Sequence, residues 1–174
     1  MVRASIILIS FNHEAFIEAA LLSALRQDMA DFELVIVDDA STDRTQAIIR
    51  EVLARDEFVG RRISKIFNEH NQGVLAAVNT AMAAATGEAF VMMAGDDISM
   101  PDRLRRTVAI FERNPEVQLV YGEVEIIDEH GAMVRPAPEG GAVKRFTYSH
   151  ARLGRIYAGA SPCGASAAYR RPLF

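Results

Sequence analysis

The sequence has little cysteine, no long apolar run and no general excess of positive charge. Cys163 is the only cysteine among 174 residues, so an internal disulfide is excluded and a reducing compartment is expected. No apolar run approaches the roughly 20 residues that span a bilayer. The short N-terminal apolar run passes directly into polar residues and predicts a strand, not a signal peptide. We therefore expect a cytoplasmic protein with no transmembrane segment, and peripheral attachment to a membrane stays open.

Acidic side chains are absent from the last part of the chain. The net charge of −4 gives no general case for binding nucleic acid. Residues 140–174, however, carry six basic side chains and no acid. Either the acidic neighbours of these cations lie elsewhere in the fold or in sequence absent here, or the cations form a surface that faces phosphates or an anionic acceptor.

Several common ligand motifs are also missing. No GxGxxG follows the first apolar run and no GxxxxGK[ST] occurs, so a dinucleotide fold is poorly supported and a P-loop is excluded. No His/Cys cluster has the spacing of a zinc site. The four histidines are expected to be solvated or capping residues: His13, His70, His130 and His150. What remains is a site built from oxygen ligands.

Apolar runs and helical periodicities alternate along the chain. Strands are expected at residues 5–10, 32–38, 62–67, 90–94 and 117–127, the last interrupted at Gly122. Helices are expected at 14–27, from Ser41 or Thr42 to about 54, at 73–85, and from a Ser99 cap to about 114. Short elements are expected within 148–156 and 165–169. This order predicts an α/β fold with a mostly parallel central sheet and helices on both faces.

Two pairs of adjacent acids follow apolar strands: Asp38-Asp39 and Asp96-Asp97. Ligands of parallel α/β sheets bind at the carboxyl ends of the strands, where both pairs are expected. Carboxylates held this close repel each other, so a metal ion or hydrogen-bond donors from a ligand would stabilise them. Mg²⁺ and Mn²⁺ take one or two carboxylates together with phosphate oxygens and water. The alternative is that each pair serves a turn or the start of the next helix.

A polar segment, Ser10-Phe11-Asn12, follows the first strand. It offers an aromatic ring beside a base and polar groups for the edge of that base. A carboxylate such as Asp39 can accept hydrogen bonds from the imide N–H of uracil or from sugar hydroxyls. The alternative interpretation of Phe11 is a core residue.

These pieces, in this order, resemble the donor half of a family 2 glycosyltransferase with the GT-A fold, close to the spore-coat polysaccharide glycosyltransferase type. The resemblance covers residues 4–125 and includes the following motifs: Ser10-Phe11-Asn12, Val37–Asp43, Asn71-Gln72-Gly73, Asn79, Thr86-Gly87-Glu88, Ala94–Asp97 and Met100–Leu104. It implies a Rossmann-like three-layer α/β/α architecture and an inverting transfer in polysaccharide biosynthesis. The donor would be a nucleotide-diphosphate sugar, most often UDP-linked, the cofactor Mn²⁺ or Mg²⁺, and the acceptor a saccharide or a lipid-linked molecule.

Carried over by residue, the resemblance implies that Phe11 lines the base and that Asp39 meets the uracil. Ser10 and Asn12 would belong to the same nucleotide site. Asp96 would meet the ribose, and Asp97, the last acid of a DxD-like motif, would bind the metal. One departure is Ala94, where many members have an acid.

The resemblance also sets domain limits. Residues 1–125 would form the donor-binding subdomain, and 126–174 part of an acceptor-side region. The last acid is Glu139, whereas the family's catalytic base lies well into the acceptor half. We therefore expect a truncated chain whose base lies beyond Phe174, and donor binding with little or no transfer.

Two other classes are weighed against this one. A sugar nucleotidyltransferase needs a glycine-rich, basic loop after the first strand, which residues 10–16 lack. A non-catalytic nucleotide-binding or phospho-receiver domain is the remaining alternative. A receiver needs a lysine downstream of its acids, but Lys65 falls on a predicted strand.

Overall fold

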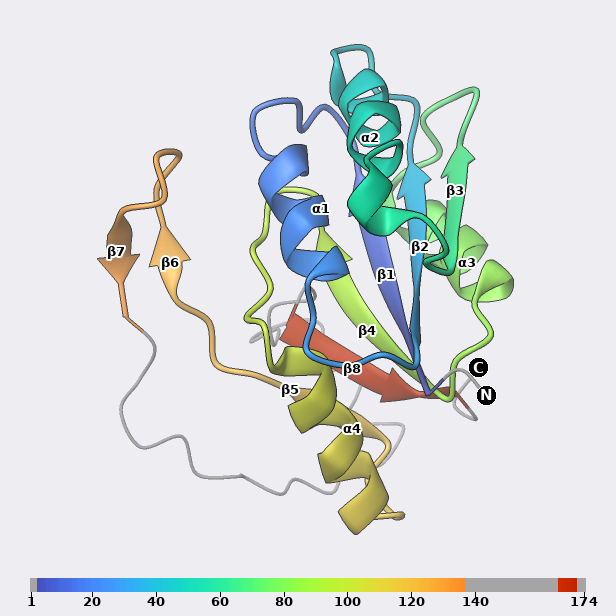
Figure 1. The fold of residues 1–174 in the computed structure, drawn as a ribbon, viewed down its shortest axis with the longest axis vertical. Helices are drawn as coiled ribbons and strands as arrows, with labels where there is room; N and C mark the ends of the chain where they lie inside the picture. Colours follow the sequence, from blue (N-terminus) through green and yellow to red (C-terminus); the bar gives the residue numbers. More distant parts are fainter. Residues whose placement is uncertain (1–2, 137–165, 172–174) are drawn as a thin grey trace.

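A six-stranded sheet forms the centre of the computed structural model, which describes residues 3–136 and 166–171. Its order is β3-β2-β1-β4-β8-β5 (Figure 1). The strands are β1 Ala4–Ser10, β2 Phe32–Asp38, β3 Ile63–Phe67, β4 Ala89–Ala94, β5 Leu119–Tyr121 and β8 Ala167–Arg170. The first four run parallel, and β8 is antiparallel to both its neighbours. The predicted α/β class and mostly parallel sheet are confirmed.

Helices cover both faces of the sheet. They are α1 Ile17–Leu25, α2 Thr45–Leu53, α3 Val74–Ala84 and α4 Arg103–Arg113, with a short 3₁₀ turn, η1, at Asp56–Phe58. The buried side chains of α1, α2 and α4 pack into one core cluster and those of α3 into another on the opposite face (Figure 1). This is the three-layer α/β/α arrangement.

The continuous apolar runs of β1 and β2 follow from this double coverage. Ile6 and Leu8 point into the core beneath α1, while Ile7 between them points toward α3. Side chains on both faces of a covered parallel strand must be apolar. On the α3 side, the small side chains of Ala77 and Ala81 are fully buried and let the helix approach the sheet closely.

The predicted strand at 117–127 divides where Gly122 stands. β5 stays in the central sheet, but β6 Ile126–Ile127 pairs with β7 Met133–Arg135 in a separate two-stranded sheet. The predicted element at 165–169 is β8, and that at 148–156 lies outside the described residues. The subdomain limit at 125 stays a prediction, although the central sheet takes β8 from beyond it.

The expected caps of α2 and α4 are wrong. The helices begin at Thr45 and Arg103, and neither Ser41 nor Ser99 caps them with its side chain. Ser41 Oγ donates to the buried carboxylate of Asp38 instead. The start of α4 is held by a glutamine that follows α1: Gln27 Oε1 accepts from the Leu104 N–H at 3.0 Å.

Two of the six cations in the acid-free tail, Arg170 and Arg171, lie among the described residues. The Arg170 guanidinium donates to the carbonyls of Val117 and Phe111. Arg171 donates to the Thr86 carbonyl. Arg170 pairs with Ala89 at the amino end of β4, so both cations lie away from the acid pairs. Backbone carbonyls accept from these two cations, where one of our two interpretations expected acidic neighbours.

Candidate functional site

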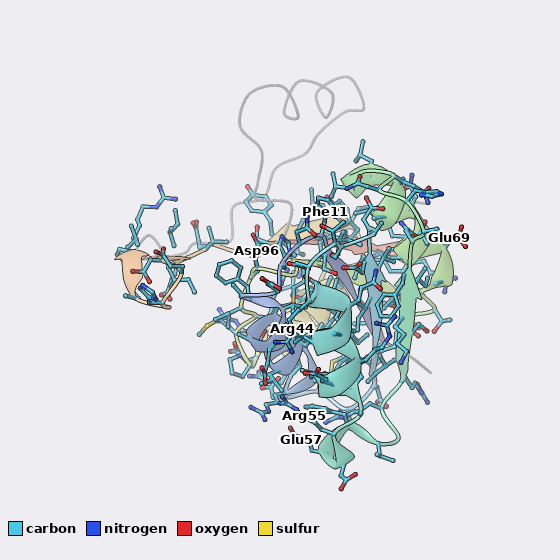
Figure 2. All side chains as sticks on the ribbon, turned by 90° about the horizontal axis from the view of Figure 1, so that it is seen from above. Phe11, Arg44, Arg55, Glu57, Glu69 and Asp96 are labelled. Carbon is cyan, nitrogen blue, oxygen red and sulfur yellow. The ribbon has the colours of Figure 1, made fainter. Side chains whose placement is uncertain are left out.

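Three loops meet at the carboxyl ends of the parallel strands, which we call the carboxyl edge of the sheet. β1 lies between β2 and β4, with Ser10 opposite Asp38 and Ile9 opposite Ala94. The loops that follow these strands are therefore neighbours at the upper edge in Figure 1. Figure 2 looks down onto this edge, where Phe11 and Asp96 are labelled. The prediction that the two acid pairs share one edge is confirmed.

The first acid, Asp38, is buried and fully hydrogen-bonded. Its carboxylate accepts from Ser10 Oγ at 2.8 Å, the Ser41 N–H at 2.9 Å and Gln46 Nε2 at 2.8 Å. Ser41 Oγ donates to it as well. Asp38 and Ser10 both have no exposed surface. The side chains of Asp38 and Ser10 therefore hold the loops after β1 and β2 in place from within the core.

The second acid, Asp39, is 2% exposed and anchors the loop after β3. Its carboxylate accepts from Asn68 Nδ2 at 2.7 Å, the Gln72 N–H at 3.0 Å and the Gly73 N–H at 2.7 Å. Burial raises the pKa of Asp39, but the hydrogen bonds from Gln72, Asn68 and Gly73 outweigh it and hold that pKa below its usual range. The motif Asn71-Gln72-Gly73 thus supplies donors to this acid.

Asn12 connects the loops that follow β1 and β2. Its Oδ1 accepts from the Thr42 N–H at 2.8 Å, and its own N–H donates to Ser41 Oγ at 2.8 Å. Asn12 has φ 55°, a left-handed conformation that asparagine tolerates better than most residues. The adjacent Phe11 ring is 41% exposed, so it is not a core residue and its surface is available at the edge.

The second pair has few partners. The side chain of Asp96 is 51% exposed, and its ion-pair partner is His13 at 3.9 Å. The carboxylate of Asp97 has a hydrogen bond from the Ala94 backbone and lies near Arg103 and His13. Burial, and then the negative charge of Asp96, raise the pKa of Asp97. A cation beside these two carboxylates would offset both effects.

The donor set suits a hard divalent cation. No group of three acidic, histidine or cysteine side chains is arranged for a metal in the described part of the chain. Mg²⁺ usually takes one or two protein carboxylates, with phosphate oxygens and water completing the shell. Asp97, with or without Asp96, could hold such an ion.

His13 is a site residue that the sequence reasoning missed. We expected a solvated or capping side chain, but its side chain is only 24% exposed. His13 Nδ1 is buried and has no hydrogen-bond partner among the described residues, and Nε2 lies 3.9 Å from Asp96 Oδ2. No local pattern marks this role, because it depends on the loop after β1 meeting the loop after β4.

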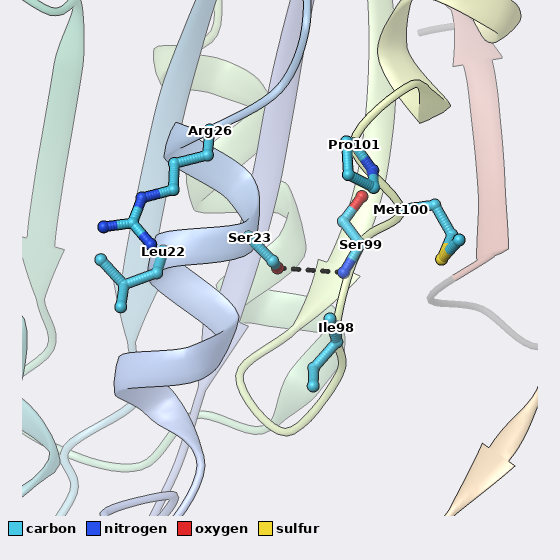
Figure 3. Close-up of a pocket in the computed structure, with 7 residues that line it drawn as sticks. All are labelled: Leu22, Ser23, Arg26, Ile98, Ser99, Met100 and Pro101. Carbon is cyan, nitrogen blue, oxygen red and sulfur yellow. Dashed lines mark hydrogen bonds between the residues drawn. The ribbon is translucent and has the colours of Figure 1, made fainter. Parts of the chain in front are cut away.

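The segment that follows Asp97 is fastened to α1. The Ser99 N–H donates to Ser23 Oγ at 3.0 Å (Figure 3), and Gln27 Nε2 donates to the Met100 carbonyl at 2.8 Å. A groove of about 300 Å³ lies between α1 and the segment at residues 98–101. It is lined by Leu22, Ser23, Arg26, Ile98, Ser99, Met100 and Pro101. These bonds hold the second acid pair from its carboxyl side.

The motif Thr86-Gly87-Glu88 lies at the opposite edge of the sheet and is structural. Glu33 accepts hydrogen bonds there from Ser5 Oγ and from the N–H groups of Thr86 and Gly87. Burial raises the pKa of Glu33, but these bonds outweigh it and lower the pKa. A Cβ at Gly87 would lie 2.6 Å from the Ser5 nitrogen, so only glycine fits.

Comparison with known families identifies the chain. A model described as "Glycosyl transferase family 2" matches residues 5–174. The chain belongs to glycosyl transferase family 2. One relative is the UDP-Glc:alpha-D-GlcNAc-diphosphoundecaprenol beta-1,3-glucosyltransferase WfgD of Escherichia coli. The two are 33% identical over 135 residues, which are 76% of this chain and 51% of WfgD. This chain spans about half the length of the curated relatives it matches.

Solved structures share the fold of this family 2 chain. TarS 1–349 of S. aureus in complex with UDP superposes with a TM-score of 0.73 over 98% of this chain and 47% of that one, at 24% identity. The mannosyltransferase PcManGT from Pyrobaculum calidifontis, in complex with GDP-Man and Mn²⁺, gives a TM-score of 0.64. It covers 71% of this chain and 36% of that one at 28% identity. The GT-A architecture is confirmed.

No helix in the described residues is long and apolar enough to cross a membrane.

Proposed function

We propose that this family 2 chain binds a UDP-sugar together with a divalent cation and forms the donor side of an inverting glycosyltransferase. One observation carries the proposal. An exposed aromatic ring, a buried carboxylate rich in donors and a carboxylate pair poor in donors share one edge of the sheet: Phe11, Asp39 and Asp96-Asp97. These are groups for a base, an imide N–H and a ribose diphosphate with its cation.

The nucleoside would lie over Phe11 and Asp39. The Phe11 ring offers an apolar face to the base. Asp39 accepts from three donors, and the Gln72 N–H is shared between both carboxylate oxygens. A carboxylate has about four acceptor positions, so the imide N–H of uracil would take the place of the longer Gln72 contact, at 3.1 Å. Asn12 and Ser10 would act on this site by holding its loops. The Ser10 hydroxyl reaches it only through Asp38.

The ribose and diphosphate would lie over the second pair. Asp96 is exposed enough to accept hydrogen bonds from ribose hydroxyls, and Asp97 would ligate Mn²⁺ or Mg²⁺. PcManGT, which carries GDP-Man and Mn²⁺, supports a metal in this family. When bound, such a cation neutralises charge on the leaving diphosphate.

The acceptor side is proposed by analogy. WfgD is named for a diphosphoundecaprenol-linked acceptor, which supports a saccharide or lipid-linked acceptor and a place in polysaccharide biosynthesis. Such an acceptor would bring a cytoplasmic protein to the membrane surface. The catalytic base is not assigned to any described residue.

The test is calorimetric titration with UDP, GDP, CMP and TDP, each with and without Mn²⁺. We expect UDP to bind tightest and its affinity to rise with Mn²⁺. Asp97→Ala should remove the Mn²⁺ dependence. The matched control, Asp102→Ala, removes an acid of the same region that pairs with Arg105 and Arg106 and should leave binding unchanged.

Two results would contradict the proposal. UDP that binds no better than the other nucleotides would refute the uracil role of Asp39. Mn²⁺-dependent binding that persists in Asp97→Ala would refute the metal role of Asp97.

A further inference from the structure

We infer that His13 is a positioning residue for Asp96. Its imidazole supports the Gly95–Asp96 turn and fixes the carboxylate that would meet the donor ribose. The inference rests on the proposed function, because it takes the ribose role of Asp96 from there. It adds a residue on the loop after β1 that controls recognition by the loop after β4.

The first observation is the fit between His13 and Gly95. A Cβ at Gly95 would lie 2.6 Å from His13 Nδ1 and 3.0 Å from Ser10 Cβ. The imidazole therefore occupies the space where a side chain of residue 95 would stand. The Gly95 N–H donates to the Ile9 carbonyl at 2.8 Å, so the turn is held by the strand on one side and meets the ring on another.

The second observation is the direction of the ring. Nδ1 is buried and has no partner in the described structure, so a proton there would be an unsatisfied buried donor. Such donors are costly and rare. The proton of the neutral ring therefore belongs on Nε2, which faces Asp96 Oδ2 at 3.9 Å. This distance is longer than a hydrogen bond, and such contacts in ligand-free sites often tighten when the ligand binds.

The third observation is that the His13 backbone is fixed independently of its side chain. The His13 N–H donates to Thr45 Oγ1 at 2.8 Å. Its carbonyl accepts from the N–H groups of Phe16 and Ile17, both at 2.9 Å. Because these bonds do not involve the imidazole, a substitution at position 13 should preserve the start of α1. The side chain can then be tested separately from the fold.

The test compares UDP with 2′-deoxy-UDP and 3′-deoxy-UDP by calorimetry in the presence of Mn²⁺. A hydroxyl that donates to a carboxylate contributes about tenfold or more in affinity. We expect the wild-type chain to prefer UDP over at least one deoxy analogue by about that factor, and His13→Ala to lose most of the preference. His13→Gln places an amide donor near the Nε2 position and should restore part of it.

Three further variants sharpen the result. Asp96→Asn should lose the preference completely, and His13→Ala added to Asp96→Asn should change it no further. Gly95→Ala keeps both side chains but drives the ring away from its place, so it should also reduce the preference. Thermal unfolding of each variant reports whether the fold is kept.

The outcomes separate this inference from the proposed function. Full ribose preference in His13→Ala, with loss in Asp96→Asn, would overturn the inference and leave the ribose role of Asp96 intact. A wild-type chain that binds UDP without any ribose preference would overturn both. Equal loss for UDP and its deoxy analogues in His13→Ala would show a structural role alone, and this too overturns the inference.

Discussion

Asp38 and Asp39 lie buried under hydrogen-bond donors, whereas Asp96 and Asp97, on the same edge of the sheet, meet almost none. The first pair accepts from Ser10, Ser41 and Gln46 and from the loop after β3. The second has a histidine at 3.9 Å. The pKa of Asp39 is lowered by its donors, and the pKa of Asp97 is raised by burial and by Asp96. Identical residue pairs therefore sit in opposite electrostatic environments.

The comparison teaches that adjacency of carboxylates does not define a ligand site. The number of donors around each carboxylate distinguishes a structural acid from one that is ready for a ligand. The acids at this edge differ clearly in this respect: Asp38 and Asp39 each accept from at least three donors, whereas Asp97 accepts one hydrogen bond, from the Ala94 backbone. The free energy of unfolding should therefore depend mainly on the first pair, whereas the second pair should affect binding with little effect on stability.

The largest expected effect is on stability at Asp38. Asp38→Ala leaves the side-chain donors of Ser10 and Gln46 without an acceptor, and we expect a loss of about 3 kcal/mol in the free energy of unfolding. Asp97→Ala should change it by less than about 0.5 kcal/mol, because the loss of the Ala94 hydrogen bond is offset by removal of a charge that burial disfavours. Urea unfolding of both variants measures the difference. Equal losses would erase the distinction between the pairs.

A second prediction sharpens the contrast at Asp39. Asp39→Asn places an amide against the N–H groups of Gln72 and Gly73, and we expect a loss of about 2 kcal/mol in unfolding free energy together with weaker UDP binding. Asp96→Asn should keep the stability within about 0.5 kcal/mol of wild type while it weakens UDP binding. Chemical unfolding and calorimetry on the same preparations test this. A stable Asp39→Asn chain would contradict the structural role.

The pairs should also respond to pH in opposite directions. The folded-state pKa of Asp39 is lowered, so its stabilisation is complete above the unfolded value of about 3.9 and is lost as pH falls through the folded pKa. The folded-state pKa of Asp97 is raised, so its charged form destabilises the fold at neutral pH, and this effect disappears as pH falls from the folded pKa toward about 3.9.

The measurement is urea unfolding of wild type, Asp39→Asn and Asp97→Asn from pH 3 to 7. The advantage of wild type over Asp39→Asn should shrink only at the acid end. Any advantage of Asp97→Asn over wild type should be present at pH 7 and shrink toward zero by the acid end of this range. Parallel curves for the two variants would refute the assigned directions.

The smallest expected effect concerns Ala40, in the loop that follows β2. Ala40 has φ 64°, a conformation that costs a non-glycine residue about 1 kcal/mol. Ala40→Gly should therefore stabilise the fold by about 0.5 kcal/mol after the entropy of glycine in the unfolded chain is counted. Ala54→Gly is the control, because Ala54 has φ −83° and should only lose stability. A destabilised Ala40→Gly would show that this backbone is not strained.

Much of the fold follows from local pattern. The parallel strands appear within a residue of their predicted starts, because a strand covered on both faces must be continuously apolar and is easy to recognise. The helix starts were less accurate. Ser99 and Ser41 have good capping chemistry, but Gln27, 72 residues away, contacts the Ser99 hydroxyl, and the neighbouring buried Asp38 accepts from the Ser41 hydroxyl. Capping partners that come from elsewhere in the chain have no local signal.

The candidate site likewise has one part that the sequence predicts and one part that only the structure reveals. The sequence by itself determined which strands end in carboxylates and, through an ordered set of motifs, the family. Only the tertiary structure decided that Asp38 is saturated, that Glu33 explains Thr86 and Gly87, and that His13 faces Asp96. These facts depend on which loops the strand order β2-β1-β4 brings together. Local propensity sets where a carboxylate stands along a strand, but its donors come from neighbours in space, and those set its charge and its role.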